Sequence, residues 1–310
     1  MARPLAILTG PTGTGKTELA LHLAEEFPVE IVSVDSAQVY RGLDIGSAKP
    51  SAQIRARVRH HLVDLVDPVQ SYSAGQFVRD CLLAIEDIEA RGRLPLLVGG
   101  TMLYLRALTG GIAALPEGSP DVRARLDADA AEQGWPMLHA RLASLDPVAA
   151  ARIHPNDAQR IQRALEVHAT TGAPISQLQQ RTQPALARDF HVVALVPGDR
   201  PRLHVALEQR FTGMMEAGLF DEVRRLYGRG DLSSEHPAIR AVGYRQLWAH
   251  LAGSYPLETA VERAIAATRQ LAKRQMTWLR SMDNIRTFDP YDAKRFVGVR
   301  ESLAGVFARA

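Results

Sequence analysis

The sequence predicts an α/β protein in which a parallel sheet flanked by helices carries an all-helical insertion. In the first third of the chain, short β-branched runs alternate with helical stretches, which is a βαβ rhythm. A glycine-rich loop joins the first strand to the first helix, as in P-loop-type sheets. Between residues 112 and 189 the β-branched runs stop, and alanine- and arginine-rich helical pieces replace them. We therefore expect a core of residues 1–111 and 190–310 and an insertion of residues 112–189.

The elements of the first core segment follow from hydrophobic periodicity and turn residues. We expect a strand, a helix, a strand, a helix and a strand at Ala6–Leu8, Lys16–Phe27, Glu30–Val34, Ala74–Ala90 and Leu94–Val98. The second helix has apolar residues at helical spacing, Ser73 as its N-cap and Gly92 beyond its end. Strands that alternate with helices in this way form parallel sheets.

The insertion and the last third read mainly as helices. Helical pieces are expected at Asp121–Gln133, Met137–Leu145, Ala158–Thr170, Arg202–Glu216, Asp221–Tyr227 and Leu257–Leu279. Glycines and prolines from Gly110 to Pro120 mark the entry to the insertion. A strand over Phe190–Val196 then returns the chain to the sheet.

The loop at residues 10–17 reads GPTGTGKT and is the most specific chemical signal in the chain. Its glycines allow backbone conformations in which successive N–H groups point at phosphate oxygens. Lys16 adds a positive charge, Thr17 offers a hydroxyl for Mg²⁺, and the helix that begins here favours an anion at its N-terminus. The predicted diphosphate-binding residues are Gly10, Pro11, Thr12, Gly13, Thr14, Gly15, Lys16 and Thr17.

Polar residues and glycines also follow the next two strands of the expected sheet. Residues 35–38 read DSAQ and residues 99–101 read GGT. Ligands collect at the carboxyl ends of parallel strands, so both segments should face the phosphate loop. Asp35 is the candidate general base, although a carboxylate there could instead order the water shell of a magnesium ion. Thr101 offers a hydroxyl, and the glycines before it either allow close backbone approach or form a plain turn.

The composition of the chain limits which cellular compartment and which type of binding partner we expect. No run approaches the ~18 apolar residues that a membrane-spanning helix needs, the N-terminus leaves no room for a signal peptide, and Cys81 is the only cysteine. We expect a cytoplasmic protein without disulfides, in which Cys81 is a core residue and the neighbouring His60 and His61 are structural. In residues 191–310, Lys and Arg outnumber Asp and Glu by 18 to 13, which favours a polyanionic partner.

A set of longer segments, spread over nearly the whole chain, carries a family resemblance. They are GPTGTGKT at 10–17, DSAQVYRGLDIGSAKP at 35–50, HHLVD at 60–64, VGGTMLY at 98–104, NDAQRIQRALEV at 156–167, AIRAVGYRQLW at 238–248 and TRQLAKRQMTWLR at 268–280. This set resembles the bacterial tRNA dimethylallyltransferases, also called tRNA isopentenyltransferases. Gly75, Gln76 and Met102 are small departures that remove no reactive group.

The resemblance implies transfer of a dimethylallyl group from dimethylallyl diphosphate to N6 of the adenosine just 3′ of the tRNA anticodon, with Mg²⁺ as cofactor. The phosphate loop would then hold a leaving group, and Arg210 would add a cation to the same oxygens. Asp35 takes the role of the base for the amino protons of the adenine, and Thr101 holds the amine in line. Thr17 is the residue expected to contact Mg²⁺.

The resemblance also implies tRNA contacts on both expected domains, with the anticodon stem-loop as the bound part. The matching residues are Asp35, Ser36, Ala37, Gln38, Thr101, Arg123, Gln159, Arg160, Ile161, Gln162, Arg163, Arg240, Ala241, Val242, Gly243, Tyr244 and Arg245. The target base would be flipped into a channel between the core and the insertion, where Gln38 would read one edge of the adenine. On the last long helix Arg269, Lys273 and Arg274 read as a stripe facing the RNA backbone, with Trp278 in the core. A monomer satisfies all of these expectations.

Three rival functions remain at this point. A P-loop kinase of small metabolites would share the loop and the sheet, but it needs neither a helical insertion with paired arginines nor a basic last third. An enzyme that prenylates free adenine nucleotides is weakened by the same two regions. A non-catalytic RNA-binding protein with a relic nucleotide site has no physical need for an intact Lys16, Thr17, Asp35 and Thr101.

Overall fold

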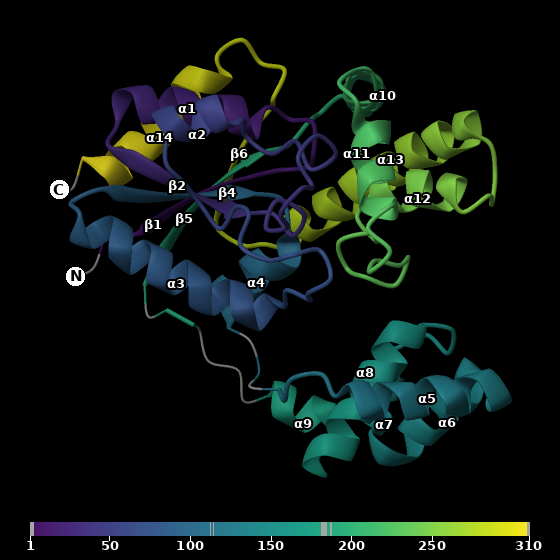
Figure 1. Cartoon of the computed structure of the whole chain (residues 1–310). Coiled ribbons are helices and arrows are strands. Elements are labelled where there is room, and N and C mark those ends of the chain that lie inside the picture. The colour runs from purple at the N-terminus through teal and green to yellow at the C-terminus, as the bar shows by residue number, and fades with distance from the viewer. Residues whose placement is uncertain (1–2, 112, 114, 181–184, 187, 309–310) are drawn as a thin grey trace. The chain divides into compact units, whose positions relative to one another are not determined.

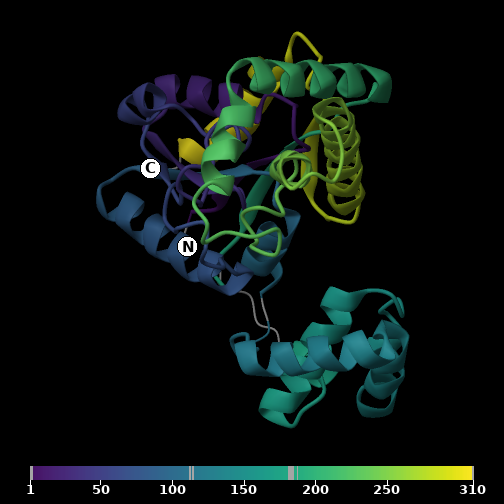
Figure 2. The ribbon, with the colours of Figure 1, turned by 45° about the vertical axis from the view of Figure 1, so that its right-hand side comes forward.

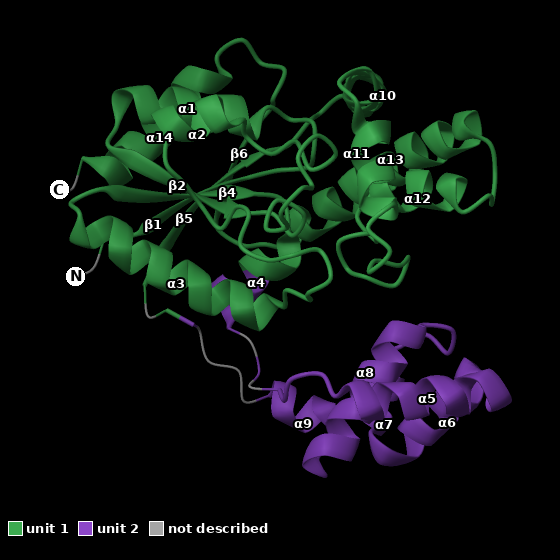
Figure 3. Ribbon diagram, in the orientation of Figure 1, with its two compact units in different colours: residues 1–105, 186–310 green, residues 106–185 purple. Residues whose placement is uncertain are grey.

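The computed structural model describes residues 3–111, 113, 115–180, 185–186 and 188–308. The chain forms two compact units (Figure 3), unit 1 with residues 1–105 and 186–310 and unit 2 with residues 106–185. Residue 112, the expected start of the insertion, lies outside the described residues. The first boundary between the units lies between Leu105 and Arg106, a few residues before the predicted boundary at 111/112, and within the helix Met102–Gly110.

The centre of unit 1 is a six-stranded parallel sheet in the order β3-β2-β4-β1-β5-β6 (Figure 1). Its strands are β1 (Leu5–Thr9), β2 (Val29–Val34), β3 (His60–His61), β4 (Leu94–Gly99), β5 (Phe190–Leu195) and β6 (Ile285–Phe288). Every residue of β1, β2 and β4 is buried, as in parallel sheets that are covered on both faces. The predicted α/β class with a parallel sheet is confirmed. The edge strands β3 and β6 are too short to have a recognisable sequence pattern.

Helices cover both faces of this sheet (Figure 1). On one side lie α1 (Lys16–Glu26) and α14 (Arg295–Phe307), and on the other lie α3 (Ala74–Ala90) and α4 (Met102–Gly110). Buried side chains of α1 and α14 form one cluster with the central strands. The predicted N-cap at Ser73 is confirmed, because Ser73 and Gln76 form a capping box at the start of α3. Cys81 is a buried free cysteine of α3, as predicted.

A second layer of helices lies beyond one end of the sheet (Figures 1 and 2). It consists of α10 (Arg200–Glu216), α11 (Leu219–Tyr227), α12 (Tyr244–Leu251) and α13 (Leu257–Arg280). The long connection from β2 to β3, which includes α2 (Ala52–Arg57), packs Val39, Tyr40 and Leu43 into the hydrophobic cluster of these helices. The carboxyl ends of the strands therefore face helices that lie far along the chain.

In the described residues of unit 2, all regular secondary structure is helical. It contains α5 (Pro120–Gln133), α6 (Trp135–Leu145), α7 (Pro147–Ala150), α8 (Ala158–Thr171) and α9 (Ile175–Gln179). Leu126, Leu138, Leu142 and Leu165 belong to a hydrophobic cluster made of its own helices. Unit 2 thus has a core that is independent of the sheet.

Predicted elements begin and end within about two residues of the observed ones. The sequence patterns do not single out the helices α2, α4, α7, α9, α12 and α14 or the two edge strands. Of these, α4 follows the GGT turn directly, and α12 and α14 contribute buried residues to hydrophobic clusters that form only in the folded chain. No helix in the described part of the chain combines the length and the hydrophobicity needed to span a bilayer.

Candidate active site

The loop between β1 and α1 has the backbone geometry of an anion-binding turn. Gly13 and Gly15 both have φ near 79°, a region that favours glycine. The Thr14 hydroxyl and the Lys16 ammonium donate to the Pro11 carbonyl oxygen at 2.8 and 2.7 Å, which closes the loop on itself. No side chain caps the N-terminus of α1, so its first N–H groups are available to an anion.

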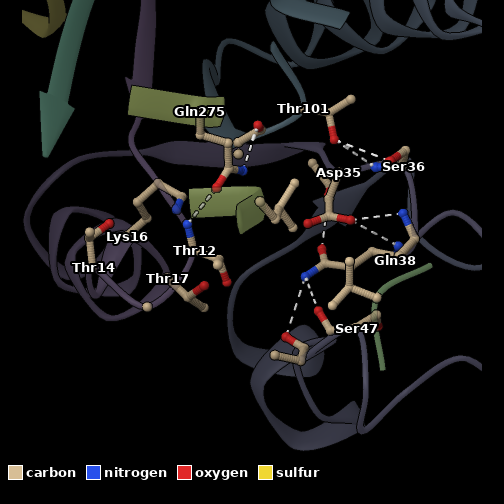
Figure 4. Close-up of a pocket in the computed structure, with 18 of the residues that line it drawn as sticks. Thr12, Thr14, Lys16, Thr17, Asp35, Ser36, Gln38, Ser47, Thr101 and Gln275 are labelled. Atoms are coloured by element: carbon tan, nitrogen blue, oxygen red, sulfur yellow. Dashed lines mark hydrogen bonds between the residues drawn. The ribbon is translucent and has the colours of Figure 1, made fainter. Parts of the chain in front are cut away.

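The ends of β2 and β4 are joined by hydrogen bonds (Figure 4). Oδ1 of Asp35 accepts from the backbone N–H of Ala37 at 2.8 Å and from that of Gln38 at 3.4 Å. Oγ1 of Thr101 accepts from the Ser36 N–H at 3.0 Å and donates to the Ser36 hydroxyl at 3.3 Å. Among the described residues only one carboxylate oxygen of Asp35 has a hydrogen-bond partner, which leaves the other oxygen to accept a proton.

The two glycines before Thr101 are needed for close backbone approach and do not form a plain turn. A Cβ on Gly99 would lie 2.1 Å from the Val34 carbonyl oxygen, and one on Gly100 would lie 3.0 Å from the Gly10 carbonyl oxygen. Larger residues would push β4 away from β2 and from the phosphate loop. Of the two interpretations of Gly99 and Gly100, close backbone approach and a plain turn, the structure supports close backbone approach.

A single cavity of about 740 Å³ in unit 1 brings these segments together. Its wall contains the phosphate loop, residues 35–38, the 99–101 turn and one side of α10 and α13. Charged and polar side chains from distant parts of the chain meet there, among them Lys16, Glu18, Asp35, Thr101, Arg210, Arg240 and Arg274. Of the residues predicted for catalysis and diphosphate binding, Thr12 to Thr17, Asp35, Thr101 and Arg210 line this cavity. Gly10 and Pro11 are buried and are not among its lining residues.

Its electrostatics favour an anionic ligand. Burial, followed by the nearby charge of Arg210, lowers the pKa of Lys16 to about 8, while Asp35 opposes that shift. Burial also lowers the pKa of Arg210, again opposed by Asp35. Two cations that destabilise each other in a partly desolvated cavity gain most when a diphosphate or a similar anion lies between them.

Gln275 of α13 is a residue that the sequence analysis missed. Its Oε1 accepts from the Thr12 N–H at 2.9 Å and its Nε2 donates to the Gly100 carbonyl oxygen at 2.8 Å (Figure 4). The only sequence signal was its position inside the TRQLAKRQMTWLR segment. In the same segment, Trp278 was predicted to be a core residue, and this is wrong: it is half-buried and lines the cavity.

Several predicted tRNA-binding residues of unit 1 lie at the cavity or on the surface. Ser36, Ala37, Arg240, Ala241 and Val242 line the cavity, and Arg245 is exposed. Gly243 and Tyr244 are buried instead, and the Tyr244 hydroxyl donates to Glu222 at 2.6 Å. The buried Tyr244 side chain cannot contact RNA directly, so the prediction of a tRNA contact is wrong for this side chain. Its role is structural.

The side-chain amide of Gln38 makes most of its hydrogen bonds within the protein. Its Nε2 donates to the carbonyl oxygens of Ser47 and Ala48, both at 3.3 Å, and its Oε1 accepts from the Ser33 hydroxyl at 2.8 Å. Both amide protons are used, so the side chain fixes the residues after β2 against the loop at 47–48. Only a remaining lone pair on Oε1 is left for an adenine edge.

On α8 of unit 2, the predicted RNA-binding residues divide into exposed and buried ones. Gln159 and Arg160 are exposed, whereas Ile161 is fully buried in the core of the unit, so a direct contact by its side chain is excluded. Gln162 is half-buried and donates to Asp127. The arginines of this region are organised by a carboxylate, as described next.

Arg123 and Arg163 share one buried carboxylate, that of Glu166. Arg123 donates to it at 2.8 Å and Arg163 at 2.6 Å, and the Ser119 N–H adds a third bond at 2.8 Å. Although burial acts to raise it, the pKa of Glu166 is lowered because these donors stabilise the carboxylate. Both arginines are partly exposed and are held in fixed positions on unit 2.

The histidine pair has structural partners, in agreement with the sequence interpretation. A ring nitrogen of His60 lies 2.7 Å from the Val58 carbonyl oxygen, and Nε2 of His61 lies 2.7 Å from Glu30. Within the described residues there is no cluster of three or more His, Cys, Asp or Glu side chains that could hold a metal by itself. A metal at this site would need ligands from the substrate.

The fold and the cavity define a class of protein: an α/β protein with a P-loop-type turn, a cavity suited to an anionic ligand and a second, helical unit. Comparison with known proteins narrows the class. Residues 38–282 match the family model described as IPP transferase. The chain belongs to this family of tRNA dimethylallyltransferases, and it is therefore a transferase.

Its relatives cover most of the chain. The tRNA dimethylallyltransferase of Bordetella petrii is 56% identical over 283 residues, which are 90% of either chain. The solved structure of the full-length tRNA isopentenylpyrophosphate transferase from Bacillus halodurans has a TM-score of 0.72 and 35% identity, and the match covers 99% of this chain and 97% of that one. A eukaryotic dimethylallyltransferase, described as acting on tRNA, has a TM-score of 0.82 and 28% identity over 98% of this chain and 78% of its own.

Proposed function

We propose that this chain transfers the dimethylallyl group of dimethylallyl diphosphate to N6 of the adenosine just 3′ of the tRNA anticodon, and releases diphosphate. The observation that carries the proposal is the common cavity of the phosphate loop and the Asp35–Thr101 pair. A diphosphate held by the loop and an amine held by the pair would meet in one enclosed space. This arrangement suits group transfer from a phosphate ester to nitrogen.

On the donor side, the diphosphate is the leaving group. The bond between C1 of the dimethylallyl group and the diphosphate oxygen breaks, and its electron pair stays on that oxygen. Backbone N–H groups of the phosphate loop, Lys16 and Arg210 stabilise the negative charge that grows there. These groups are fixed before the reaction, so little reorganisation is needed in the transition state.

On the acceptor side, the adenine amine needs a base. The lone pair of N6 is delocalised into the ring, so N6 becomes a competent nucleophile only as it loses a proton. The new N6–C1 bond forms while one amino proton moves to the free carboxylate oxygen of Asp35. Thr101, held by Ser36, orients the amine toward C1.

The residues at the loop fit Mg²⁺ as a cofactor that arrives with the diphosphate. Thr17 is exposed at the first turn of α1 and lines the cavity, as do the carboxylates of Glu18 and Asp35. One hydroxyl and one carboxylate suit an ion that takes its other ligands from diphosphate and water. When bound, Mg²⁺ neutralises charge on the leaving group.

Both units take part in tRNA binding in this proposal. Arg240, Arg245 and Arg274 on unit 1 and Arg123, Arg160 and Arg163 on unit 2 are at least partly exposed cations that can contact phosphates or stack on unpaired bases. The target adenosine is flipped into the cavity of unit 1. In this proposal the chain acts as a monomer in the cytoplasm, where a tRNA substrate is available.

The proposal is tested by label transfer. The purified protein is mixed with Mg²⁺, labelled dimethylallyl diphosphate and unmodified tRNA, with AMP and ATP as parallel acceptors. Label in tRNA alone, at the adenosine next to the anticodon, is the expected result. Label in the free nucleotides would instead indicate an enzyme that acts on nucleotides, and phosphate transfer from ATP to a small molecule would indicate a kinase.

A further inference from the structure

We infer that Gln275 is a positioning residue that couples the phosphate loop to the turn that holds the acceptor amine. The inference deepens the proposed function and rests on it. Thr12 belongs to the loop that holds the leaving diphosphate, and Gly100 directly precedes Thr101, which orients the amine. The side chain of Gln275 contacts both at hydrogen-bond distance.

The geometry of this bridge is well defined. Gln275 is 8% exposed, and its amide makes a bond in each direction, accepting at Oε1 and donating at Nε2. It comes from α13, 263 residues along the chain from Thr12 and 175 from Gly100. A Cβ on Gly100 would lie 2.5 Å from Nε2, so the glycine leaves room for this contact.

The base of the Gln275 side chain is fixed by packing. Its neighbours on α13, Ala272 and Met276, form a buried cluster with Leu203 and Leu207 of α10. A Cβ on Gly13 would lie 2.7 Å from Leu207, so the same cluster also contacts the phosphate loop. Both hydrogen bonds of Gln275 therefore start from a side chain whose base is held by the packing of α10 against α13.

This bridge bears on the reaction in two ways. First, the Thr12 N–H is directed at Gln275, so the N–H groups further along the loop remain for the diphosphate. Second, displacement at C1 requires the amine and the leaving oxygen in line, and small errors in their separation are costly. Strands β1 and β4 fix the loop ends, whereas Gln275 fixes the loops themselves relative to each other.

The first test is kinetic and uses three variants. Gln275→Met removes both hydrogen bonds at similar size, Gln275→Glu keeps the acceptor for Thr12 and loses the donor to Gly100, and Gln270→Met is the matched control at an exposed position of α13. We expect kcat for tRNA prenylation to fall by ~10–100-fold in both Gln275 variants. For Gln275→Met we expect KM values for both substrates within about threefold of wild type and a lower Tm, because the Thr12 N–H and the Gly100 carbonyl lose their partner. The control should leave kcat, KM and Tm unchanged.

A near wild-type kcat in Gln275→Met, or a kcat restored in Gln275→Glu, would overturn the coupling. The first result would make the bridge dispensable, and the second would confine its role to the Thr12 bond. A kcat of Gln275→Met that returns to the wild-type value when the assay is run well below the Tm of the variant would likewise contradict positioning, because it would assign the residue to stability alone.

The second test does not depend on prenyl transfer. Amide hydrogen exchange is followed in peptides that contain residues 10–17 and residues 99–101, with and without Mg²⁺ and inorganic diphosphate. In the wild-type protein we expect the ligand to slow exchange in both segments, and in Gln275→Met only in the phosphate loop. Slowing of both segments in the variant would disprove coupling through Gln275, whereas failure of the wild type to label tRNA would count against the proposed function alone.

Discussion

At the scale of single residues, Asp35 and Lys16 have environments that suit opposite tasks. The Asp35 carboxylate is anchored through one oxygen by backbone N–H groups, and its other oxygen faces the cavity. Burial first, and then the nearby charge of Arg210, lowers the pKa of Lys16. In the proposed reaction the proton-accepting group therefore follows β2 and the anion-binding group follows β1, two strands that are separated by β4 in the sheet.

Asp35→Asn tests the proposed base with little change of structure. Asparagine keeps an oxygen that can accept from Ala37 and Gln38, so the turn after β2 should persist. We expect kcat to fall by ~10²–10⁴-fold with the affinity for inorganic diphosphate retained. Calorimetric binding and single-turnover rates measure the two effects, and an unchanged rate would remove Asp35 from the mechanism.

The lowered pKa of Lys16 predicts a pH dependence of diphosphate binding. Because the pKa of about 8 in the free protein lies below the ordinary 10.5, Lys16 is charged at pH 7 and loses its proton between about pH 7 and pH 9. The affinity should then decrease by up to about tenfold per pH unit above pH 8. Lys16→Arg is the control, since its guanidinium stays charged, and an equal decline in that variant would exclude Lys16 as the cause.

At the scale of elements, the wall of the cavity depends on a buried carboxylate of α11. Glu222 is 2% exposed and accepts from the backbone N–H groups of Asp44, Ile45 and Gly46 at 2.8–3.2 Å, as well as from the Tyr244 hydroxyl. It joins α11 and α12 to the loop that follows β2. The adjoining residues of that loop accept the hydrogen bonds of Gln38.

Replacement of Glu222 should destabilise the protein far more than replacement of its tyrosine partner. Glu222→Ala leaves three backbone donors without their acceptor, and we expect a loss of about 3 kcal/mol or more in the free energy of unfolding. Tyr244→Phe removes one bond and should cost about 1 kcal/mol. Urea unfolding of both variants measures this, and equal losses would show that the loop does not depend on Glu222.

At the scale of the whole molecule, two units with separate cores each present cations, which in the proposed function bind one RNA. Unit 2 has its own hydrophobic cluster and fixes Arg123 and Arg163 through Glu166, whereas unit 1 places Arg240 at the cavity. Such a division lets the reacting groups stay on the rigid sheet while the second unit contributes binding surface.

Arg160→Ala and Arg240→Ala test this division. We expect each to weaken tRNA binding and to reduce the salt dependence of binding by about one unit of slope, with diphosphate affinity unchanged. The effects of the two substitutions should add, because the residues lie in different units and share no partner. Filter binding at several salt concentrations measures the slopes, and an effect limited to diphosphate binding would contradict the prediction.

The sequence by itself determined what depends on local pattern. Alternating strands and helices predicted the parallel sheet, GPTGTGKT predicted the phosphate loop, and strand-end residues predicted the Asp35–Thr101 pair. These features can be predicted because hydrophobic periodicity and glycine conformation depend on a few neighbouring residues. Ligands of parallel sheets bind at the carboxyl ends of the strands, so the residues that follow each strand can be picked out as well.

Only the tertiary structure decided which of these residues are available and what holds them in place. It buried Ile161 and Tyr244, brought Trp278 to the cavity, and set Gln275 between two loops. In each case the deciding contact joins elements that are distant in the sequence, and a side chain's burial and hydrogen-bond partners follow from that packing rather than from its neighbours along the chain.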